Sequence, residues 1–261
     1  MNTTMRLSLL ACLWAGPLFA AELSVDEIVT KANLAAYYQG ADGKASVQMT
    51  ITDRKGQTRD RQFNILRKDV EDGGDQLYFV YFTRPSDVRR MAYLVHKHVG
   101  KDDNRWLYLP ALSLVKRIAA GDKRTSFVGS DFLYEDVSGR GLEEDTHTLV
   151  ASADKFHIVK NVPKDPGAVE FNYYTVAIDR NTFVPMKMEF YDKTDTLYRV
   201  IETLEVKEFQ GFSTVTKSLV KDLKSGSQTE MVFSDVQYDL GLEESLFTER
   251  YLQRPPREAT R

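Results

Sequence analysis

Hydrophobic positions follow two different periods along the chain. After Ser24, apolar residues recur at the three- and four-residue spacing of a helix as far as Gly40. Ser24 and Glu27 have the spacing of a capping box at the start of this segment, which predicts one amphipathic helix from about Ser24 to Gln39. From Ala45 onward, apolar and polar residues alternate with period two, which predicts β-strands.

The first alternating segments predict a hairpin with one apolar face. Met49 and Ile51 share one face of the first segment, and Phe63 and Ile65 share one face of the second. The next segment, Gln76–Thr83, is apolar on both faces. A strand of this kind is expected to be covered on both sides.

The second half of the chain predicts a run of hairpins over residues 146–238. Turn sequences such as Asp165-Pro166-Gly167 and Gln210-Gly211 separate the alternating segments, which is typical of an antiparallel meander. A sheet of about ten or eleven strands cannot stay flat, so we expect a mainly β fold in which a curled antiparallel sheet forms a half-open barrel. After it, Gly241–Leu252 predicts a short closing helix and Gln253–Arg261 an exposed tail.

Residues 119–142 interrupt the alternation with several glycines. Within them, Thr125–Val137 predicts short helices that carry the large apolar side chains Phe127, Phe132, Leu133 and Tyr134. A surface loop rarely carries so much apolar surface. We therefore expect a short helical lid packed over the sheet.

The start of the chain has the layout of a secretory signal peptide. Arg6 precedes an apolar stretch, which is followed by small residues at Ala20 and is too short to span a bilayer unaided. We expect a signal peptide over residues 1–20 and a single domain over residues 21–261. The alternative is a lipoprotein signal at Cys12, the only cysteine, but it leaves almost no apolar stretch after Arg6. Without Cys12, the mature protein has no thiol for a disulfide, a metal site or a nucleophile.

Charge is mild overall and uneven in its distribution. A net charge of −3 gives no indication of nucleic-acid binding. Lys and Arg gather within residues 84–124, where they could contact the acidic surface of a partner or anionic lipid headgroups. The alternative is an ordinary solvated strand face. The candidate partner-docking residues are Arg89, Arg90, Lys116 and Arg117.

The acidic residues Asp131, Glu135 and Asp136 form the one cluster in the predicted lid that resembles an acid/base site. The favoured interpretation is structural, with helix capping and salt bridges to the basic residues Lys123, Arg124 or Arg140. No motif supplies a second catalytic group. A hydrolase that uses Asp131 and Glu135 remains the weakest of the functional alternatives.

His96 and His98 have the spacing of a metal pair on one strand face, but the nearest carboxylates belong to the following turn. Two solvated histidines are the favoured interpretation. The sequence contains no nucleophile elbow, P-loop or dinucleotide fingerprint. We therefore expect no enzyme activity, no metal and no cofactor.

Methionine and aromatic side chains recur on predicted inner faces. Val184, Met186, Met188 and Phe190 share one face of a single segment. Methionine is flexible and suits a cavity that accepts variable apolar guests. The alternative is an ordinary filled core, and composition alone does not distinguish the two.

Several motifs closely resemble the outer-membrane lipoprotein-sorting protein family of LolA-like and LolB-like periplasmic carriers. They are Trp106–Leu112, Lys116–Ile118, Phe127–Phe132, Tyr134–Asp136, the pattern Asp179-x-x-Thr182-x-x-Pro185-x-Lys187, and Leu246–Thr248. The resemblance implies a half-open barrel with an apolar cavity between sheet and lid. It also implies a periplasmic carrier that passes a lipid or lipoprotein acyl chain between membrane partners. Such partners include an inner-membrane exporter of the RND/MMPL type and an outer-membrane acceptor.

On this interpretation, inner strand faces and the lid form the ligand-binding site. Its predicted residues are Met49, Ile51, Phe63, Ile65, Phe79, Tyr81, Met91, Tyr93, Trp106, Phe127, Phe132, Leu133, Phe171, Tyr173, Met186, Met188 and Phe190. The alternative from another functional class is a non-carrying interaction module of an envelope or exporter complex. That module would have a filled core and a functional basic surface.

Overall fold

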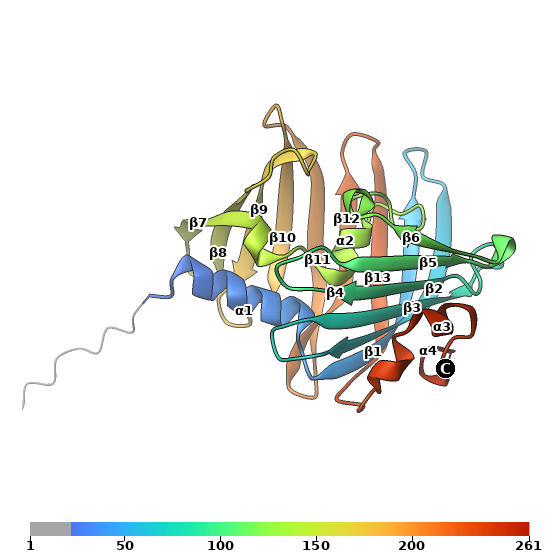
Figure 1. Ribbon diagram of the computed structural model, residues 1–261. Helices are drawn as coiled ribbons and strands as arrows, with labels where there is room; N and C mark the ends of the chain where they lie inside the picture. Colours follow the sequence, from blue (N-terminus) through green and yellow to red (C-terminus); the bar gives the residue numbers. More distant parts are fainter. Residues whose placement is uncertain (1–21, 261) are drawn as a thin grey trace, which may run out of the picture.

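The computed structural model describes residues 22–260, which form one curled antiparallel sheet with a few short helices (Figure 1). The predicted signal peptide and the alternative at Cys12 lie outside these residues. The strands are β1 Asp42–Thr52, β2 Thr58–Asp69, β3 Gln76–Arg84, β4 Ala92–Lys97, β5 Asn104–Leu109, β6 Leu114–Ile118, β7 Asp145–Ser152, β8 Phe156–Pro163, β9 Phe171–Asp179, β10 Pro185–Asp192, β11 Leu197–Phe209, β12 Phe212–Asp222 and β13 Ser227–Tyr238.

The helical elements are short except for the first. They are α1 Val25–Tyr37, η1 Pro110–Leu112, η2 Ala120–Asp122, α2 Tyr134–Ser138, η3 Leu142–Glu144, η4 Glu244–Leu246, α3 Glu249–Gln253 and α4 Arg257–Thr260. No helix within residues 22–260 combines the length and the apolar character needed to cross a membrane.

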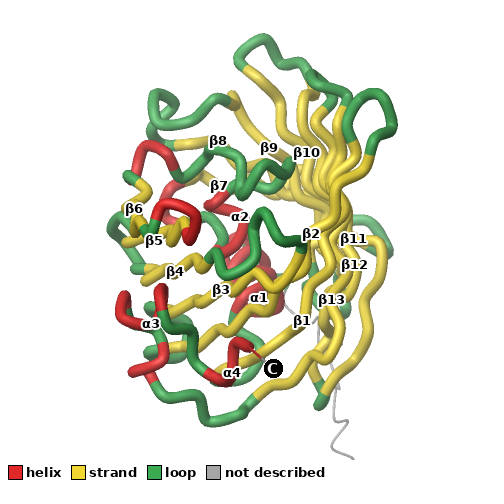
Figure 2. The backbone as a smooth tube through the Cα atoms, turned by 90° about the vertical axis from the view of Figure 1, so that its right-hand side faces the viewer, coloured by secondary structure: helices red, strands yellow, loops and turns green. Residues whose placement is uncertain are grey.

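The strand order is β6-β5-β4-β3-β2-β1-β13-β12-β11-β10-β9-β8-β7. Strands that follow each other in sequence are therefore neighbours, except β6 and β7 at the two edges. The first and last strands, β1 and β13, pair at the centre. The edge strands β6 and β7 do not pair with each other in the part of the chain described, so the sheet curls without closing (Figure 2). The predicted half-open barrel is confirmed. The expected ten or eleven strands were too few, since the sheet has thirteen.

Helix α1 begins at the predicted capping box. The backbone N–H of Glu27 donates to Oγ of Ser24 at 3.3 Å, and the Glu27 carboxylate accepts from the backbone N–H of Ser24 at 2.8 Å. Ile28, Val29 and Ala32 are buried on the face that turns toward the sheet. The helix contacts β7, β8 and β12, so it covers part of the concave side of the sheet.

Residues 119–142, the lid, connect the edge strand β6 to the opposite edge strand β7. The ring of Phe127 lies 5.8 Å from Phe82 and 5.5 Å from Tyr93 between centroids, and the Tyr134 ring lies 5.2 Å from Tyr93. Phe132 joins the same buried cluster. The predicted lid over the concave face is thereby confirmed.

The C-terminal segment packs against the opposite, outer face of β2 to β5. Leu66, Phe79 and Leu94 are fully buried there, in one cluster with Leu252 and Ala259. The side-chain amide of Asn64 also donates to the carbonyl oxygen of Ala259 at 2.9 Å. The prediction of an exposed tail was therefore wrong, because the apolar outer face of these strands needs a cover.

Candidate ligand-binding pocket

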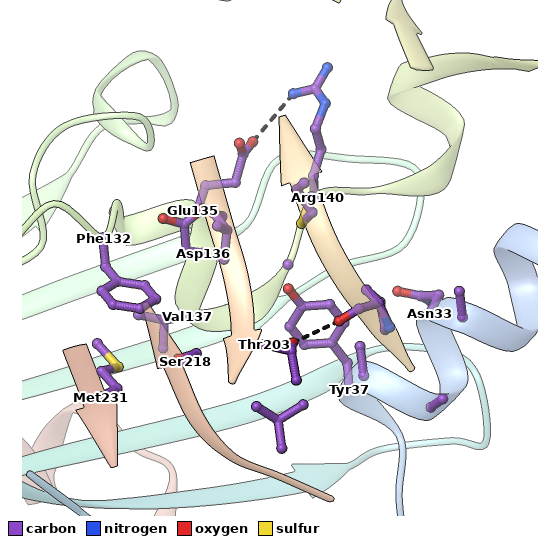
Figure 3. A pocket seen from close by; sticks show the side chains of 18 of the residues that line it. Asn33, Tyr37, Phe132, Glu135, Asp136, Val137, Arg140, Thr203, Ser218 and Met231 are labelled. Atoms are coloured by element: carbon purple, nitrogen blue, oxygen red, sulfur yellow. Dashed lines mark hydrogen bonds and ion pairs between the residues drawn. The ribbon is translucent and has the colours of Figure 1, made fainter. Parts of the chain in front are cut away.

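A pocket of about 420 Å³ lies between the concave face of the sheet, helix α1 and the lid (Figure 3). This volume falls within the ~300–1,000 Å³ typical of small-molecule sites. Most of the lining is apolar: Val29, Ala32, Ala35 and Ala36 come from α1; Phe127, Phe132 and Val137 come from the lid; and Ala45, Phe63, Ile65, Val80, Val159, Val176, Ile178, Met188, Phe190, Ile201, Met231 and Phe233 come from the sheet.

Strand alternation and register bring the sheet residues of this lining together. Ile65 pairs with Val80 across β2 and β3, so both side chains point to the concave face. Met231 pairs across β13 with Met49 on one side and with Ser218 on the other. The inward rows therefore run continuously across the seam between β1 and β13.

The predicted ligand-binding residues fall into three groups. The pocket lining includes Phe63, Ile65, Phe127, Phe132, Met188 and Phe190. The packed core beside the pocket contains Met49, Ile51, Met91, Tyr93 and Phe171. The third group lies elsewhere: Phe79, Tyr81 and Trp106 belong to the cluster under the C-terminal helices, Tyr173 stacks on Tyr191 at 4.6 Å, and Leu133 and Met186 are half-buried outside the lining.

Two of the residues that the prediction placed wrongly, Phe79 and Tyr81, lie on β3, a strand that is apolar on both faces. In β3, Tyr78, Val80 and Phe82 turn inward, whereas Phe79 and Tyr81 turn outward. With a period of two, a strand of this composition fits either orientation, and the choice depends on what covers each face. In β9, a register irregularity opposite Tyr191 and Asp192 places both Phe171 and Tyr174 inside and leaves Tyr173 outside.

Helix α1 supplies pocket residues that the sequence prediction did not include. Ala32, Ala35 and Ala36 line the pocket, together with Asn33 and Tyr37. The available signal was the series of small residues at helical spacing, since alanine lets a helix lie close to a cavity without filling it.

Glu135 lies at the centre of an ion-pair network within the lid. Its side chain is 4% exposed, and its carboxylate contacts the Arg124 guanidinium, Nζ of Lys123 at 3.1 Å and Nη1 of Arg140 at 3.3 Å. Burial alone would raise the pKa of Glu135, but Arg124, Lys123 and Arg140 together outweigh burial and lower it. The favoured structural interpretation of the acidic cluster is confirmed by these contacts.

The other acidic residues of the cluster fasten the lid to the sheet. The Asp136 carboxylate pairs with the buried guanidinium of Arg199 on β11 and accepts from the backbone N–H of Leu133 at 2.6 Å. The Asp131 carboxylate accepts hydrogen bonds from the hydroxyls of Thr229, at 2.6 Å, and Ser227 on β13. These carboxylates hold the closed lid in place.

Glu170 extends the network to the segment before β9 and gives a pH prediction. Burial raises the pKa of Glu170, but the two hydrogen bonds from Arg124, each 2.7 Å, help to lower it from 4.5 to about 2. A carboxylate with a depressed pKa stabilises the folded state above its unfolded value and loses that contribution as it is protonated. We expect the free energy of unfolding to fall between about pH 4.5 and pH 2. Denaturation curves of Glu170→Gln should show a weaker pH dependence in this window, and equal slopes would contradict the prediction.

The predicted partner-docking residues are exposed. Arg89 and Arg90 follow β3 in the turn before β4, and Lys116 and Arg117 lie on the edge strand β6. Among residues 22–260, none of the four forms an ion pair, although the Arg117 guanidinium donates to the Asn104 side chain. Their role in docking remains a prediction.

The two histidines considered as a metal pair have separate partners. Nε2 of His96 lies 2.7 Å from the carbonyl oxygen of Phe247, and Nδ1 of His98 lies 2.6 Å from the Asp75 carboxylate. Residues 22–260 contain no group of three or more side chains arranged to hold a metal ion.

Comparison with known proteins gives the family. A family model with the description "Uncharacterized protein" matches residues 74–254. A DUF1329 family protein from Desulfovibrio piger is 28% identical, with a TM-score of 0.79 over 88% of this chain and 97% of that chain. An outer membrane lipoprotein-sorting protein domain from Vibrio parahaemolyticus is 27% identical, with a TM-score of 0.79 over 87% of this chain and 97% of that chain. The chain belongs to the family that this model describes, and it is similar to a DUF1329 family protein and to an outer-membrane lipoprotein-sorting protein domain.

The LolA-like fold extends to more distant structures. A LolA superfamily protein from Nitrosomonas europaea, 18% identical, has a TM-score of 0.68 over 88% of this chain and all of that chain. No protein with a curated description matches the chain. The resemblance to lipoprotein-sorting proteins that the sequence predicted is confirmed by the similarity to the Vibrio parahaemolyticus domain, and the half-open fold by all three structures.

Proposed function

We propose that this LolA-like protein is a periplasmic carrier that binds a lipid or lipoprotein acyl chain in the pocket and passes it between membrane partners. The observation that carries the proposal is the pocket of about 420 Å³, mostly apolar, that the side chains leave unfilled between sheet and lid. A filled core would have favoured an interaction module. The similarity to a lipoprotein-sorting domain supports both the ligand class and the periplasmic location.

An acyl chain that crosses an aqueous compartment needs an apolar pocket that covers it. Each methylene that leaves water contributes about 0.8 kcal/mol, so a sixteen-carbon chain costs on the order of 13 kcal/mol to expose. A carrier has to cover this surface during transit and needs no chemical step, cofactor or metal. Release requires a partner that binds the ligand better or that favours the open lid.

The basic surface is the proposed contact with such a partner. Arg89, Arg90, Lys116 and Arg117 present exposed cations without ion-pair partners among the residues described. An inner-membrane exporter of the RND/MMPL type on one side and an outer-membrane acceptor on the other fit the proposed transfer. Replacing all four residues by serine should weaken partner binding and leave ligand retention unchanged.

Ligand retention can be tested with a tryptophan that fills the pocket. Ala35 lines the pocket from α1, whereas its neighbour Leu34 is exposed and lies outside the lining. We expect native mass spectrometry and lipid extraction to find acyl ligand on the purified mature protein and on Leu34→Trp. Ala35→Trp should lose most of it.

Two outcomes would contradict the carrier function. A mature protein that neither retains nor accepts lipid has no carrier activity. Equal retention by Ala35→Trp and Leu34→Trp would place the ligand somewhere other than this pocket. If lipid never binds and the four serine replacements still abolish partner binding, the protein is an interaction module.

A further inference from the structure

Most polar side chains that line the pocket have hydrogen-bond partners within the protein. The Thr203 hydroxyl donates to the carbonyl oxygen of Pro185 at 2.7 Å, and the Thr214 hydroxyl lies 2.8 Å from the hydroxyl of Tyr238. The Tyr174 hydroxyl donates to the Asp145 carboxylate at 2.8 Å. These groups are satisfied when the pocket holds no ligand.

Three lining side chains differ from this rule: Asn33, Tyr37 and Ser218. Within residues 22–260, neither the Tyr37 hydroxyl, the Ser218 hydroxyl nor the Asn33 side-chain amide forms a hydrogen bond to the protein. Asn33 and Tyr37 are four residues apart on α1, so they share one helix face. We call these three side chains the polar subsite.

Ser218 lies on the opposite wall of the pocket, on strand β12. Ser218 pairs with Thr203 on β11 and Met231 on β13, and Val220 follows it on the same face of β12. Figure 3 shows Ser218 near Phe132, Val137 and Met231, with Tyr37 and Asn33 on the helix side. Ser218 is 8% exposed. The Ser218 hydroxyl is not among the buried side-chain atoms that lack a partner, so it is open to the pocket and a ligand there can reach it.

The chemistry of the subsite selects a neutral acceptor over an anion. Burial raises the pKa of Tyr37, and Asp136 and Glu135 raise it further, so its hydroxyl stays protonated and can donate. The nearby cations have carboxylate partners, since Arg124 pairs with Glu170, Arg140 with Asp145 and Arg199 with Asp136, and Arg199 does not line the pocket. A carboxylate without a free cation would be costly to bury, whereas a carbonyl oxygen needs only a donor.

We propose that Asn33, Tyr37 and Ser218 form a hydrogen-bonding subsite for the carbonyl group of an acyl chain bound as an ester or amide. This inference rests on the proposed carrier function and adds the linkage that the carrier recognises. The apolar lining holds the hydrocarbon, and the subsite holds the carbonyl at its end. A plain hydrocarbon or an ether-linked chain lacks the acceptor.

The test compares two ligands that differ only in the carbonyl: 1-decanoylglycerol, an ester, and 1-O-decylglycerol, its ether counterpart. Tyr37→Phe and Ser218→Ala each remove one hydroxyl with little change in shape. Ser234→Ala, at an exposed position on β13, is the matched control. Dissociation constants are measured by isothermal titration on the mature protein, and thermal unfolding is recorded for each variant.

We expect each hydroxyl deletion to weaken ester binding about two- to tenfold, the range for one net hydrogen bond, and to change ether binding less than twofold. Thermal stability of the ligand-free variants should not fall, since neither hydroxyl has a partner to lose. Equal effects on both ligands, or none on either, would overturn the subsite and leave the carrier function standing. That includes the case in which the hydroxyls bind only water. Failure of the unaltered protein to bind either ligand would overturn both proposals.

Discussion

Replacing Glu135 by glutamine is expected to lower the free energy of unfolding by about 3–5 kcal/mol, the range for removing one partner of a buried ion pair. Glu135 is the shared carboxylate for Arg124, Lys123 and Arg140 within the lid. Glutamine keeps the shape but leaves three closely spaced cations without their common counter-charge. Urea denaturation followed by circular dichroism measures the change directly.

An exposed carboxylate gives the control for this variant. Glu205 pairs with Lys207 at 2.9 Å, but both side chains are largely solvated. Glu205→Gln should therefore change stability far less. Since Glu135 joins separate parts of the lid to one another, limited proteolysis of Glu135→Gln should also cut faster within residues 119–142. Similar stabilities for the two variants would mean that the network within the lid does not stabilise it.

Replacing Gly139 by alanine is expected to destabilise the fold by on the order of 2–4 kcal/mol, from a forbidden backbone region and a clash together. Gly139 has φ +79° and ψ 154°, a combination essentially restricted to glycine. A Cβ atom there would lie 2.7 Å from Cε2 and Cζ of Tyr37. The Tyr37 ring would have to move, so ligand binding in the pocket should weaken as well.

Gly129 offers a matched comparison within the same lid. It has φ +77°, but a Cβ atom there would meet nothing within 4 Å. Gly129→Ala should therefore show only the backbone cost, about 1–2 kcal/mol. Thermal and urea unfolding of the two variants separate the backbone cost from the clash. If Gly139→Ala were no less stable than Gly129→Ala, the contact with Tyr37 would not contribute to the loss of stability.

Much of the fold follows from local sequence patterns. Helix α1 and the hairpins of the second half were predicted because capping chemistry, period and turn residues agree with one another there. The lid was predicted because large apolar side chains interrupt a glycine-rich segment. Strand β6 was not predicted. It is only five residues long, and its sequence Leu114-Val115-Lys116-Arg117-Ile118 does not alternate between apolar and polar residues.

The orientation of strands that are apolar on both faces could not be predicted locally. Phe79 and Trp106 were expected to face the cavity, but the C-terminal helices cover their face of the sheet. Which face receives those helices depends on how residues 241–260 return to β2 and β3, a contact far away in sequence. The same contact explains why the predicted tail is packed.

Only part of the candidate site was predicted, and the missing part again depends on packing between distant segments. Inward aromatic and methionine residues such as Phe63 and Met188 carry a clear strand signal and line the pocket. Asn33, Tyr37 and Ser218 carry no such signal, because a polar residue on a helix or strand is ordinarily solvated. Only the packing of α1 against the sheet shows that these side chains face a cavity and lack partners.

The pairing of β1 with β13 bears on how the chain reaches this fold. Every other ladder in the described sheet joins strands that follow each other in sequence, so loop closure is cheap for all of them. The first six strands and the last seven can each assemble as a local meander, and the seam between the first and last strands is the single non-local step. A chain that ended before Ser227 would keep most of both meanders and lose the one ladder that joins them.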